Sequence, residues 1–267
     1  FGDKLGVEIS IISTEQNILK NFQNVVKQCD LEIDNIIYTP YAIGLSLLSE
    51  EEKELGVALV DIGSTLSSLS IFYNGTILFT KIIPLGGNMI TNDISRIFSL
   101  SKADSERVKI INGQLIEELE NSLSIIEVDA LGNDNDSVEI TRKDLISVIK
   151  PRVKEIINTL KEQVLESGYN HLIANRVVIT GGASQMDGLI NITSTIIEKR
   201  ARLGKSNVIK GIPENMRSSS FSAINSLLTY SIINNNEISV RNNIKSNNSG
   251  GLYIYLIKFK NWILENF

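Results

Sequence analysis

The dipeptide Asn74-Gly75 constrains the fold of this chain more than any other local feature of its sequence. Both residues tolerate the positive φ that a type I′ turn requires, so the pair favours a two-residue β-hairpin. Alternating segments flank it, and we predict them to be strands over residues 67–73 and 76–83. An apolar strand over residues 57–61 precedes them and ends in the carboxylate of Asp61. The sequence therefore predicts a run of hairpin-linked strands that begins at a strand-terminal aspartate.

Helical and strand patterns alternate through the rest of the chain. Further strands are predicted over residues 6–12, 33–38 and 176–180. Helices are predicted over residues 18–26, 41–49, 186–197 and 218–232, and helices are expected to start near Thr91, Ser101 and Thr141. Residues 50–54 are interpreted as an acidic loop, and the Asn-, Ser- and Gly-rich residues 234–251 as a flexible linker.

Composition and charge exclude several classes of protein. The apolar content of 42% and charged content of 21% are typical of a globular domain. The formal net charge of −5 and the absence of a basic cluster in the body of the chain argue against nucleic acid as the main partner. The single cysteine, Cys29, excludes an internal disulfide and favours a reducing, cytosolic compartment. The single histidine, His171, is interpreted as a surface residue and not as a metal ligand.

Three short motifs carry chemistry that a nucleotide site would need. Asp61 and Gly63 end a strand, where a carboxylate can hold hydrated Mg²⁺ and backbone N–H groups can approach a phosphate. A strand followed by Gly181-Gly182 allows the backbone to come close to an anionic or planar ligand. Glu106 and Lys109 lie one turn apart on a predicted helix. Each motif alone has a plain structural alternative: a common turn, a packing glycine pair or a surface ion pair.

Taken in order, these motifs resemble the second half of the actin, Hsp70 and sugar-kinase fold, an α/β actin-like ATPase (RNase H-like) fold. Within that superfamily the chain resembles FtsA, a bacterial actin-like cell-division protein. The resemblance covers nearly the whole chain. It is carried by the segments GVALVDIG, IPLGGNMITNDIS, ERVKIINGQ, ITRKDLISVIKPRVKEI, VVITGGASQMDGL and ARLG. Because the chain starts at Phe1 without an initiator methionine, we expect it to be N-terminally incomplete.

The resemblance implies a division into lobes. Residues 1–30 would end the subdomain that FtsA carries in place of an actin subdomain, and 31–54 with 209–232 would belong to the first lobe. Residues 55–92 and 173–208 would form the nucleotide-binding second lobe, and 93–172 its outer subdomain. Residues 233–251 would be the linker and 252–267 a C-terminal amphipathic helix.

The resemblance also implies a site for ATP and Mg²⁺. Asp61 would hold the metal, Glu106 and Lys109 would bind the ribose and base, and the remaining residues would approach the phosphates or the adenosine. The implied nucleotide-binding set is Asp61, Gly63, Ser64, Thr65, Gly86, Gly87, Glu106, Lys109, Gly181, Gly182, Ala183 and Ser184. The family's usual loop, Asp-Ile-Gly-Gly-Gly-Thr-Thr-Asp, is here DIGSTLSS, which lacks two glycines and the second carboxylate. We therefore expect weakened metal assistance and no significant catalytic turnover.

The C-terminal segment indicates a membrane contact on physical grounds. Placed on a helix, it has an apolar stripe flanked by Lys258 and Lys260, as in helices that lie in a membrane interface. The stripe comprises Leu252, Tyr255, Leu256, Phe259, Trp262, Ile263 and Phe267. The alternative is a helix that packs back on the body, and the polar linker before it argues against that alternative.

These features together predict a recruiting function at the cytoplasmic side of the inner membrane, as a peripheral protein at the division site. The resemblance implies partners in the C-terminal tail of FtsZ, in anionic lipid, in other divisome proteins and in further copies of the chain as an actin-like filament. Arg152 and Glu155 are the predicted residues for FtsZ contact. Two alternatives stay open at this point: a sugar or acetate kinase of the same superfold, and a scaffold like the pilus-assembly ATPases.

Overall fold

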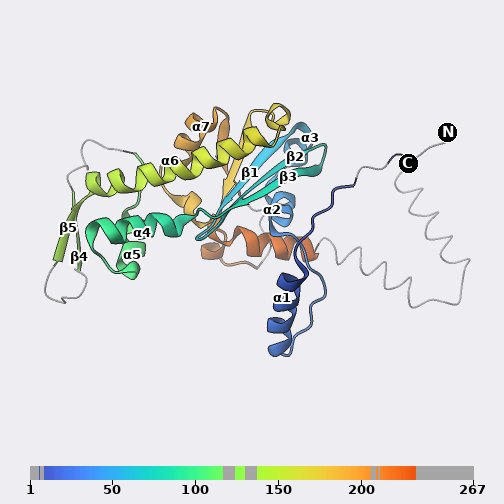
Figure 1. Cartoon of the computed structure of the whole chain (residues 1–267), viewed down its shortest axis with the longest axis horizontal. Coiled ribbons are helices and arrows are strands. Elements are labelled where there is room, and N and C mark those ends of the chain that lie inside the picture. Colours follow the sequence, from blue (N-terminus) through green and yellow to red (C-terminus); the bar gives the residue numbers. More distant parts are fainter. Residues whose placement is uncertain are drawn as a thin grey trace, which may run out of the picture.

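A five-stranded sheet forms the centre of the protein in the computed structural model, which describes residues 6, 9–116, 124–129, 137–205, 209 and 211–232. The strand order is β3-β2-β1-β6-β7, and Figure 1 shows the sheet above α2. β1, β2 and β3 are antiparallel neighbours, whereas β6 and β7 extend the sheet in parallel with β1. The strand bounds are Val57–Ile62 (β1), Ser67–Tyr73 (β2), Thr76–Ile83 (β3), Arg176–Thr180 (β6) and Arg200–Leu203 (β7).

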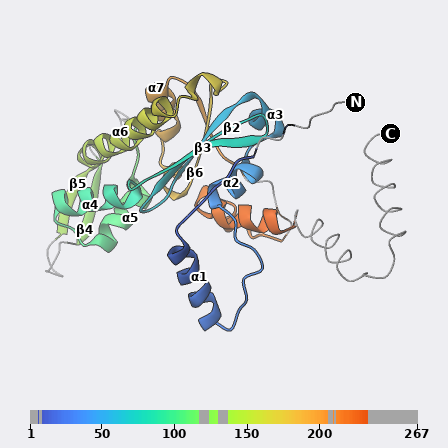
Figure 2. The same cartoon turned by 45° about the vertical axis from the view of Figure 1, so that its right-hand side comes forward.

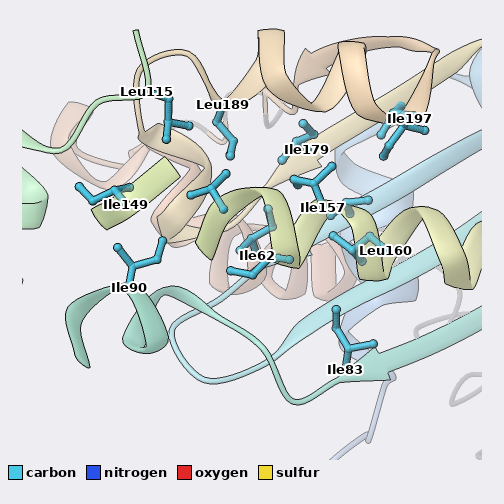
Figure 3. Close-up of a cluster of buried hydrophobic side chains, with 14 of the residues drawn as sticks. Ile62, Ile83, Ile90, Leu115, Ile149, Ile157, Leu160, Ile179, Leu189 and Ile197 are labelled. Carbon is cyan, nitrogen blue, oxygen red and sulfur yellow. The ribbon is translucent and has the colours of Figure 1, made fainter. Parts of the chain in front are cut away.

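Helices cover both faces of this sheet. Helix α6 (Arg142–Glu166) and helix α7 (Leu189–Ile197) lie on one face, and α2 (Thr39–Leu47) lies on the other, together with the helical residues 222–232 (Figures 1 and 2). The apolar residues of β6 follow this division: Val177 and Ile179 join the cluster under α6 and α7, and Val178 joins the cluster under α2. Figure 3 shows how side chains from β1, β3, β6, α6, α7 and the helix of residues 87–98 meet in the larger cluster.

A smaller unit lies at the far end of α6 from the sheet (Figure 1). It contains α4 (Gly87–Phe98), α5 (Lys102–Asn112) and the two-stranded sheet of β4 (Ile125–Asp129) and β5 (Ser137–Thr141). Helix α6 is 25 residues long and begins directly after β5, so it runs from this unit to the central sheet. Its inward face is apolar along its whole length, from Leu145 to Val164.

The local predictions that rested on turn and cap chemistry are confirmed. Asn74 and Gly75 have φ values of 49° and 74°, as a hairpin turn of this kind requires. Ser101 and Thr141 each accept a hydrogen bond from the N–H three residues later and so cap α5 and α6. The predicted strand at 176–180 and the helical pattern of 218–232 are also present, the latter as a 3₁₀ turn, η4 (Ser219–Phe221), followed by an α-helix.

Several local predictions are wrong. No strand forms over the described residues of 6–12 or over 33–38, because no backbone hydrogen bonds join them to the edge strand β3. Their contacts with β3 are made by side chains, from Ser10 Oγ to the Ile77 carbonyl and between the Tyr38 and Thr80 hydroxyls. The acidic residues 50–54 are not a loop but lie in helix α3 (Glu50–Leu55), which Ser49 and Glu52 start with a capping box. Helix α4 starts at Gly87, earlier than predicted.

The remaining elements lie outside these two units. Helix α1 (Gln16–Gln28) buries none of its residues, and three further 3₁₀ turns connect the larger elements. These are η1 (Asn170–Leu172), η2 (Gly182–Gln185) and η3 (Glu214–Met216). No helix within the described residues is long and apolar enough to cross a lipid bilayer. The predicted amphipathic stripe of 252–267 and the linker before it lie outside the described residues.

Candidate functional site

Asp61 lies where two parallel strands end side by side. It pairs in register with Thr180, the last residue of β6, so the turns that follow β1 and β6 start next to each other. Gly181 has a φ of 92°, and a Cβ atom added there would collide with Asp61 Oδ1 and with the carbonyl of Ile62. Glycine is therefore needed at 181 both for its backbone conformation and for the close approach of the Asp61 carboxylate.

The Asp61 carboxylate has no hydrogen-bond donor among the residues that the structure describes. Burial disfavours its charged form and raises the pKa of Asp61 above its ordinary value. A partly buried carboxylate without a partner is costly for a protein unless a cation offsets its charge. Carboxylate oxygen is a ligand that Mg²⁺ prefers, so the donor chemistry at this position fits the metal that the sequence predicts there.

The loop after Asp61 presents a row of backbone N–H groups. Gly63 donates its N–H to the carbonyl of Leu66 at 3.0 Å, which closes the turn. In the described part of the chain, the N–H groups of Ser64, Thr65 and Leu66 have no carbonyl acceptor. Successive N–H groups of this kind form a concave site for anions. Neither Ser64 nor Thr65 has a positive φ, so these residues replace the family's glycines without backbone strain.

Gly86 and Gly87 support this loop from the start of α4. The N–H of Gly87 donates to the carbonyl of Gly63 at 2.9 Å, and the N–H of Asn88 donates to the carbonyl of Ser64 at 2.7 Å. A Cβ atom added at Gly86 would lie 2.6 Å from the Ser64 carbonyl oxygen, which is too close for any side chain. The two glycines thus let α4 pack directly on the loop. The N–H of Gly87 already donates to the Gly63 carbonyl, so it is not available to a ligand.

Glu106 and Lys109 on α5 form an ion pair that also binds α4. Lys109 Nζ donates to Glu106 Oε2 at 2.7 Å, to Thr91 Oγ1 at 2.9 Å and to the Gly87 carbonyl at 3.2 Å. Burial would raise the pKa of Glu106, but the bonds from Lys109 and Thr91 outweigh it and lower that pKa. We call Gly87, Thr91, Glu106 and Lys109 the α4–α5 clasp; its lysine is 11% exposed and its glutamate 41%.

The turn after β6 is held by hydroxyl groups from a distant segment of the chain. Ser184 Oγ donates to the Gly181 carbonyl at 2.6 Å and lies 2.9 Å from Ser219 Oγ. Thr180 Oγ1 and Ser222 Oγ lie 2.5 Å apart, and both residues are buried. The sequence motifs do not include Ser219 or Ser222. The only local signal for them is the serine run at 218–220 and 222, which has many other interpretations.

The predicted site residues meet around Gly87. A Cβ atom added there would lie 3.5 Å from Lys109 Nζ, 3.5 Å from Ala183 Cβ and 3.6 Å from the Gly63 carbonyl oxygen. The structure therefore brings together the loop after β1, the start of α4, the α5 pair and the turn that contains Gly182 and Ala183. No group of three or more His, Cys, Asp or Glu side chains is arranged to hold a metal ion among the described residues.

The predicted partner residues lie on α6, in a different environment. Arg152 makes a bidentate ion pair with Asp93 of α4, with Nε–Oδ2 and Nη2–Oδ1 distances of 2.6 and 3.1 Å. Arg152 also contacts Glu155. The hydrogen bonds to Asp93, together with the charges of both carboxylates, raise the pKa of Arg152 above its ordinary value. The Arg152 guanidinium therefore joins α4 to α6, whereas the Glu155 side chain is 51% exposed.

The sheet order and the turns at this site define an actin-like ATPase fold. The chain is similar to MreB5 of Spiroplasma citri in a crystal structure with ADP, with a TM-score of 0.67 and 18% identity over 84% of this chain and 68% of that one. It is also similar to a chain of the PilM–PilN type IV pilus biogenesis complex, with a TM-score of 0.61 and 18% identity over 80% and 58%. The predicted fold class is confirmed.

Within this fold, residues 58–226 match the model of the family described as "Cell division protein FtsA". FtsA of Pseudomonas aeruginosa is 31% identical over 269 residues, and FtsA of Agrobacterium fabrum is 30% identical over 232 residues. The chain belongs to the FtsA family of cell-division proteins, as the motifs predict. It spans 64% and 52% of the length of these two relatives, respectively, while they cover 100% and 86% of this chain.

Proposed function

We propose that the chain binds ATP at the site around Gly87. The free N–H groups of Ser64, Thr65 and Leu66 would bind phosphate oxygens, and Asp61 would hold Mg²⁺. Glu106 would accept a hydrogen bond from the ribose, and the turn from Gly181 to Ser184 would lie beside the adenosine. When bound, MgATP supplies phosphate oxygens to the loop amides and a cation that offsets the charge of Asp61.

The observation that carries this proposal is the unpartnered Asp61 carboxylate beside unpartnered backbone N–H groups. The carboxylate is costly because it is partly buried, whereas Ser64, Thr65 and Leu66 are exposed and can offer their N–H groups to a ligand. One ligand with a cation and phosphates would bind both groups together. Solved relatives of the same fold are described as bound to ADP and AMPPNP, which supports a nucleotide as this ligand. The loop has Ser67 and Ser68 where the family has further polar loop residues and a second carboxylate, so we expect binding without significant turnover.

A titration of the whole chain with ATP tests the site. We expect calorimetry to give a dissociation constant at least about tenfold lower with Mg²⁺ than with EDTA, because the cation relieves the charge on Asp61. Equal affinities with and without Mg²⁺ would contradict the metal role of Asp61. No ATP binding in either buffer would contradict the site itself.

We further propose that the chain tethers the division machinery to the membrane, as its family membership suggests. Residues 252–267 would lie in the inner leaflet, and the body would bind the C-terminal tail of FtsZ, other divisome proteins and further copies of itself. This places the protein at the cytoplasmic face of the inner membrane at the division site. The lobes would be those given by the resemblance, with 55–92 and 173–208 holding the nucleotide. Glu155 is the better-exposed of the two proposed FtsZ contacts.

Removing residues 252–267 tests the tether. We expect the whole chain to co-sediment with vesicles that contain anionic lipid, and the shortened chain to stay in the supernatant, because the apolar stripe supplies the buried area. A variant that keeps all 267 residues but carries Trp262→Glu and Ile263→Glu is the matched control for chain length, and it should also stay in the supernatant. If all three proteins co-sedimented with the vesicles to the same extent, the proposed membrane tether would be contradicted.

Two alternatives from the sequence, a sugar or acetate kinase and a pilus-assembly scaffold, share the fold but not the family match. Membership of the FtsA family favours the division function over both. The similarity to the PilM–PilN complex, at 18% identity, concerns the fold.

A further inference from the structure

The α4–α5 clasp contains one polar group that the predicted nucleotide-binding set does not include, the hydroxyl of Thr91. This residue lies on α4, one turn after Gly87, and is 6% exposed. Its Oγ1 lies 2.5 Å from Glu106 Oε2 and 2.9 Å from Lys109 Nζ. It therefore sits between the two charged residues that the sequence assigns to the ribose and the base.

The number of protons on Lys109 and Thr91 determines which atom donates in each hydrogen bond of the α4–α5 clasp. The Lys109 ammonium has three protons and no acceptor, and it has three acceptors in the clasp: Thr91 Oγ1, Glu106 Oε2 and the Gly87 carbonyl. Thr91 Oγ1 accepts from Lys109, and its own single proton has two acceptors within reach, the Gly87 carbonyl at 3.3 Å and Glu106 Oε2 at 2.5 Å. The proton goes to the much nearer Glu106 Oε2. Lys109 has no proton left for a ligand.

One oxygen of the clasp then remains for a ligand. Both bonds to Glu106 end on Oε2, and no donor to Oε1 exists among the residues that the structure describes. The carboxylate is 41% exposed, and the clasp adjoins Gly63 and Ala183 through Gly87. An ionised carboxylate oxygen accepts hydrogen bonds and donates none, so Oε1 selects a ligand that presents a hydroxyl or N–H group.

We propose that Thr91 is a positioning residue that fixes Glu106 so that Oε1 selects ribonucleotides over 2′-deoxyribonucleotides. The inference rests on the proposed nucleotide site and deepens it. Without the Thr91 hydroxyl, one of the two bonds that orient Glu106 is lost. The carboxylate can then rotate about its side-chain torsions, and the gain from a ribose hydroxyl at a fixed oxygen is reduced.

The test compares the dissociation constants of MgATP and Mg-2′-deoxyATP for the whole chain. We expect the wild type to bind ATP at least about tenfold more tightly, as a hydrogen bond to a charged group implies. Thr91→Val keeps the shape but not the hydroxyl, and the ratio should fall to about threefold or less. Thr91→Ser should restore the wild-type ratio. Thr195→Val, which removes an exposed hydroxyl on α7, is the matched control and should leave the ratio unchanged.

The outcomes separate this inference from the proposed function. If the wild type binds neither nucleotide, the nucleotide site fails. If it binds both equally, or if Thr91→Val keeps the wild-type ratio, nucleotide binding stands and the role of Thr91 is overturned. Circular dichroism of each variant checks folding. Should Thr91→Val not fold, Thr91→Ala removes the same hydroxyl with a smaller side chain that suits a helix, and it should lower the ratio in the same way.

Discussion

Replacing Asp61 with asparagine is expected to stabilise the protein and, at the same time, to remove most of its affinity for MgATP. The carboxylate is partly buried and has no donor among the described residues, so its charge opposes folding. Asparagine keeps the shape and removes the charge, which should raise the free energy of unfolding by about 1 kcal/mol at neutral pH. The affinity for MgATP should fall roughly 10- to 100-fold, the range seen when the support of a bound metal is lost.

The pH dependence of this effect follows from the sign of the pKa shift. The folded-state pKa of Asp61 is raised above its unfolded value. The contribution of the protonated Asp61 to the free energy of unfolding is therefore fully present below about pH 4. It is lost as the pH rises through the folded-state pKa. Urea unfolding of the two proteins should give equal stabilities near pH 3.5 and a more stable variant at pH 7. A variant that is less stable than the wild type at pH 7 would show that the carboxylate has a favourable partner in the folded protein.

Replacing Arg202 with methionine is expected to destabilise the fold by about 2 kcal/mol, less than a fully buried pair because the Arg202 side chain is 40% exposed. Arg202 on β7 donates to both oxygens of Glu52, at 2.8 and 2.5 Å, and to the Leu47 carbonyl at 3.0 Å. Glu52 is 5% exposed and also closes the capping box of α3 with Ser49. The substitution would leave a buried carboxylate without its cation.

Two further variants make this prediction specific. Arg96→Met removes an arginine that is 80% exposed and 3.9 Å from Asp93, and should change stability by less than about 0.5 kcal/mol. Adding Glu52→Gln to Arg202→Met should recover part of the loss, because the unpaired charge is then gone. If the double variant were as unstable as Arg202→Met alone, lost packing of the arginine would explain the effect better than the buried charge.

Hydrogen bonds from Arg202, aided by one from the Ser49 N–H, outweigh burial and lower the pKa of Glu52. A lowered pKa means that the pair contributes stability above the unfolded pKa of about 4.3, and that this contribution is lost as the pH falls through the folded value. The stability difference between the wild type and Arg202→Met should therefore narrow as the pH is lowered below about 4.

Features that depend on a few neighbouring residues were predictable from the sequence. The turn at Asn74-Gly75 and the caps at Ser101 and Thr141 each need only local chemistry, and all three are present. The alternation of residues 6–12 says which side chains could share a face, but a strand also needs backbone pairing. Ser10 contacts the edge strand β3 only through its hydroxyl, and no backbone hydrogen bond joins the described residues of this segment to β3.

The site was predictable as far as its motifs are contiguous. Asp61, Gly181 and the Glu106–Lys109 pair each have a local pattern, and the structure places them around one point. Thr91 and Ser222 have no such pattern, because a hydroxyl on a helix acquires its role from partners 15 and 42 residues away in sequence. The missing glycines at 64 and 65 predict a poorer phosphate loop, yet the loop backbone has no positive φ there that only glycine would favour.

Helix α6 runs from the smaller unit to the central sheet, and its interior proline, Pro151, lies next to Arg152, where the helix can bend. At 25 residues it is about 37 Å long, and the Arg152–Asp93 pair joins its middle to α4, which packs on the loop after Asp61. A tilt of only 5° about that point would move each end by between 1 and 2 Å, roughly the size of shift that rearranges packed helices. Such a tilt would move the end of α6 beside β5 and the end beside the central sheet in opposite directions by similar amounts.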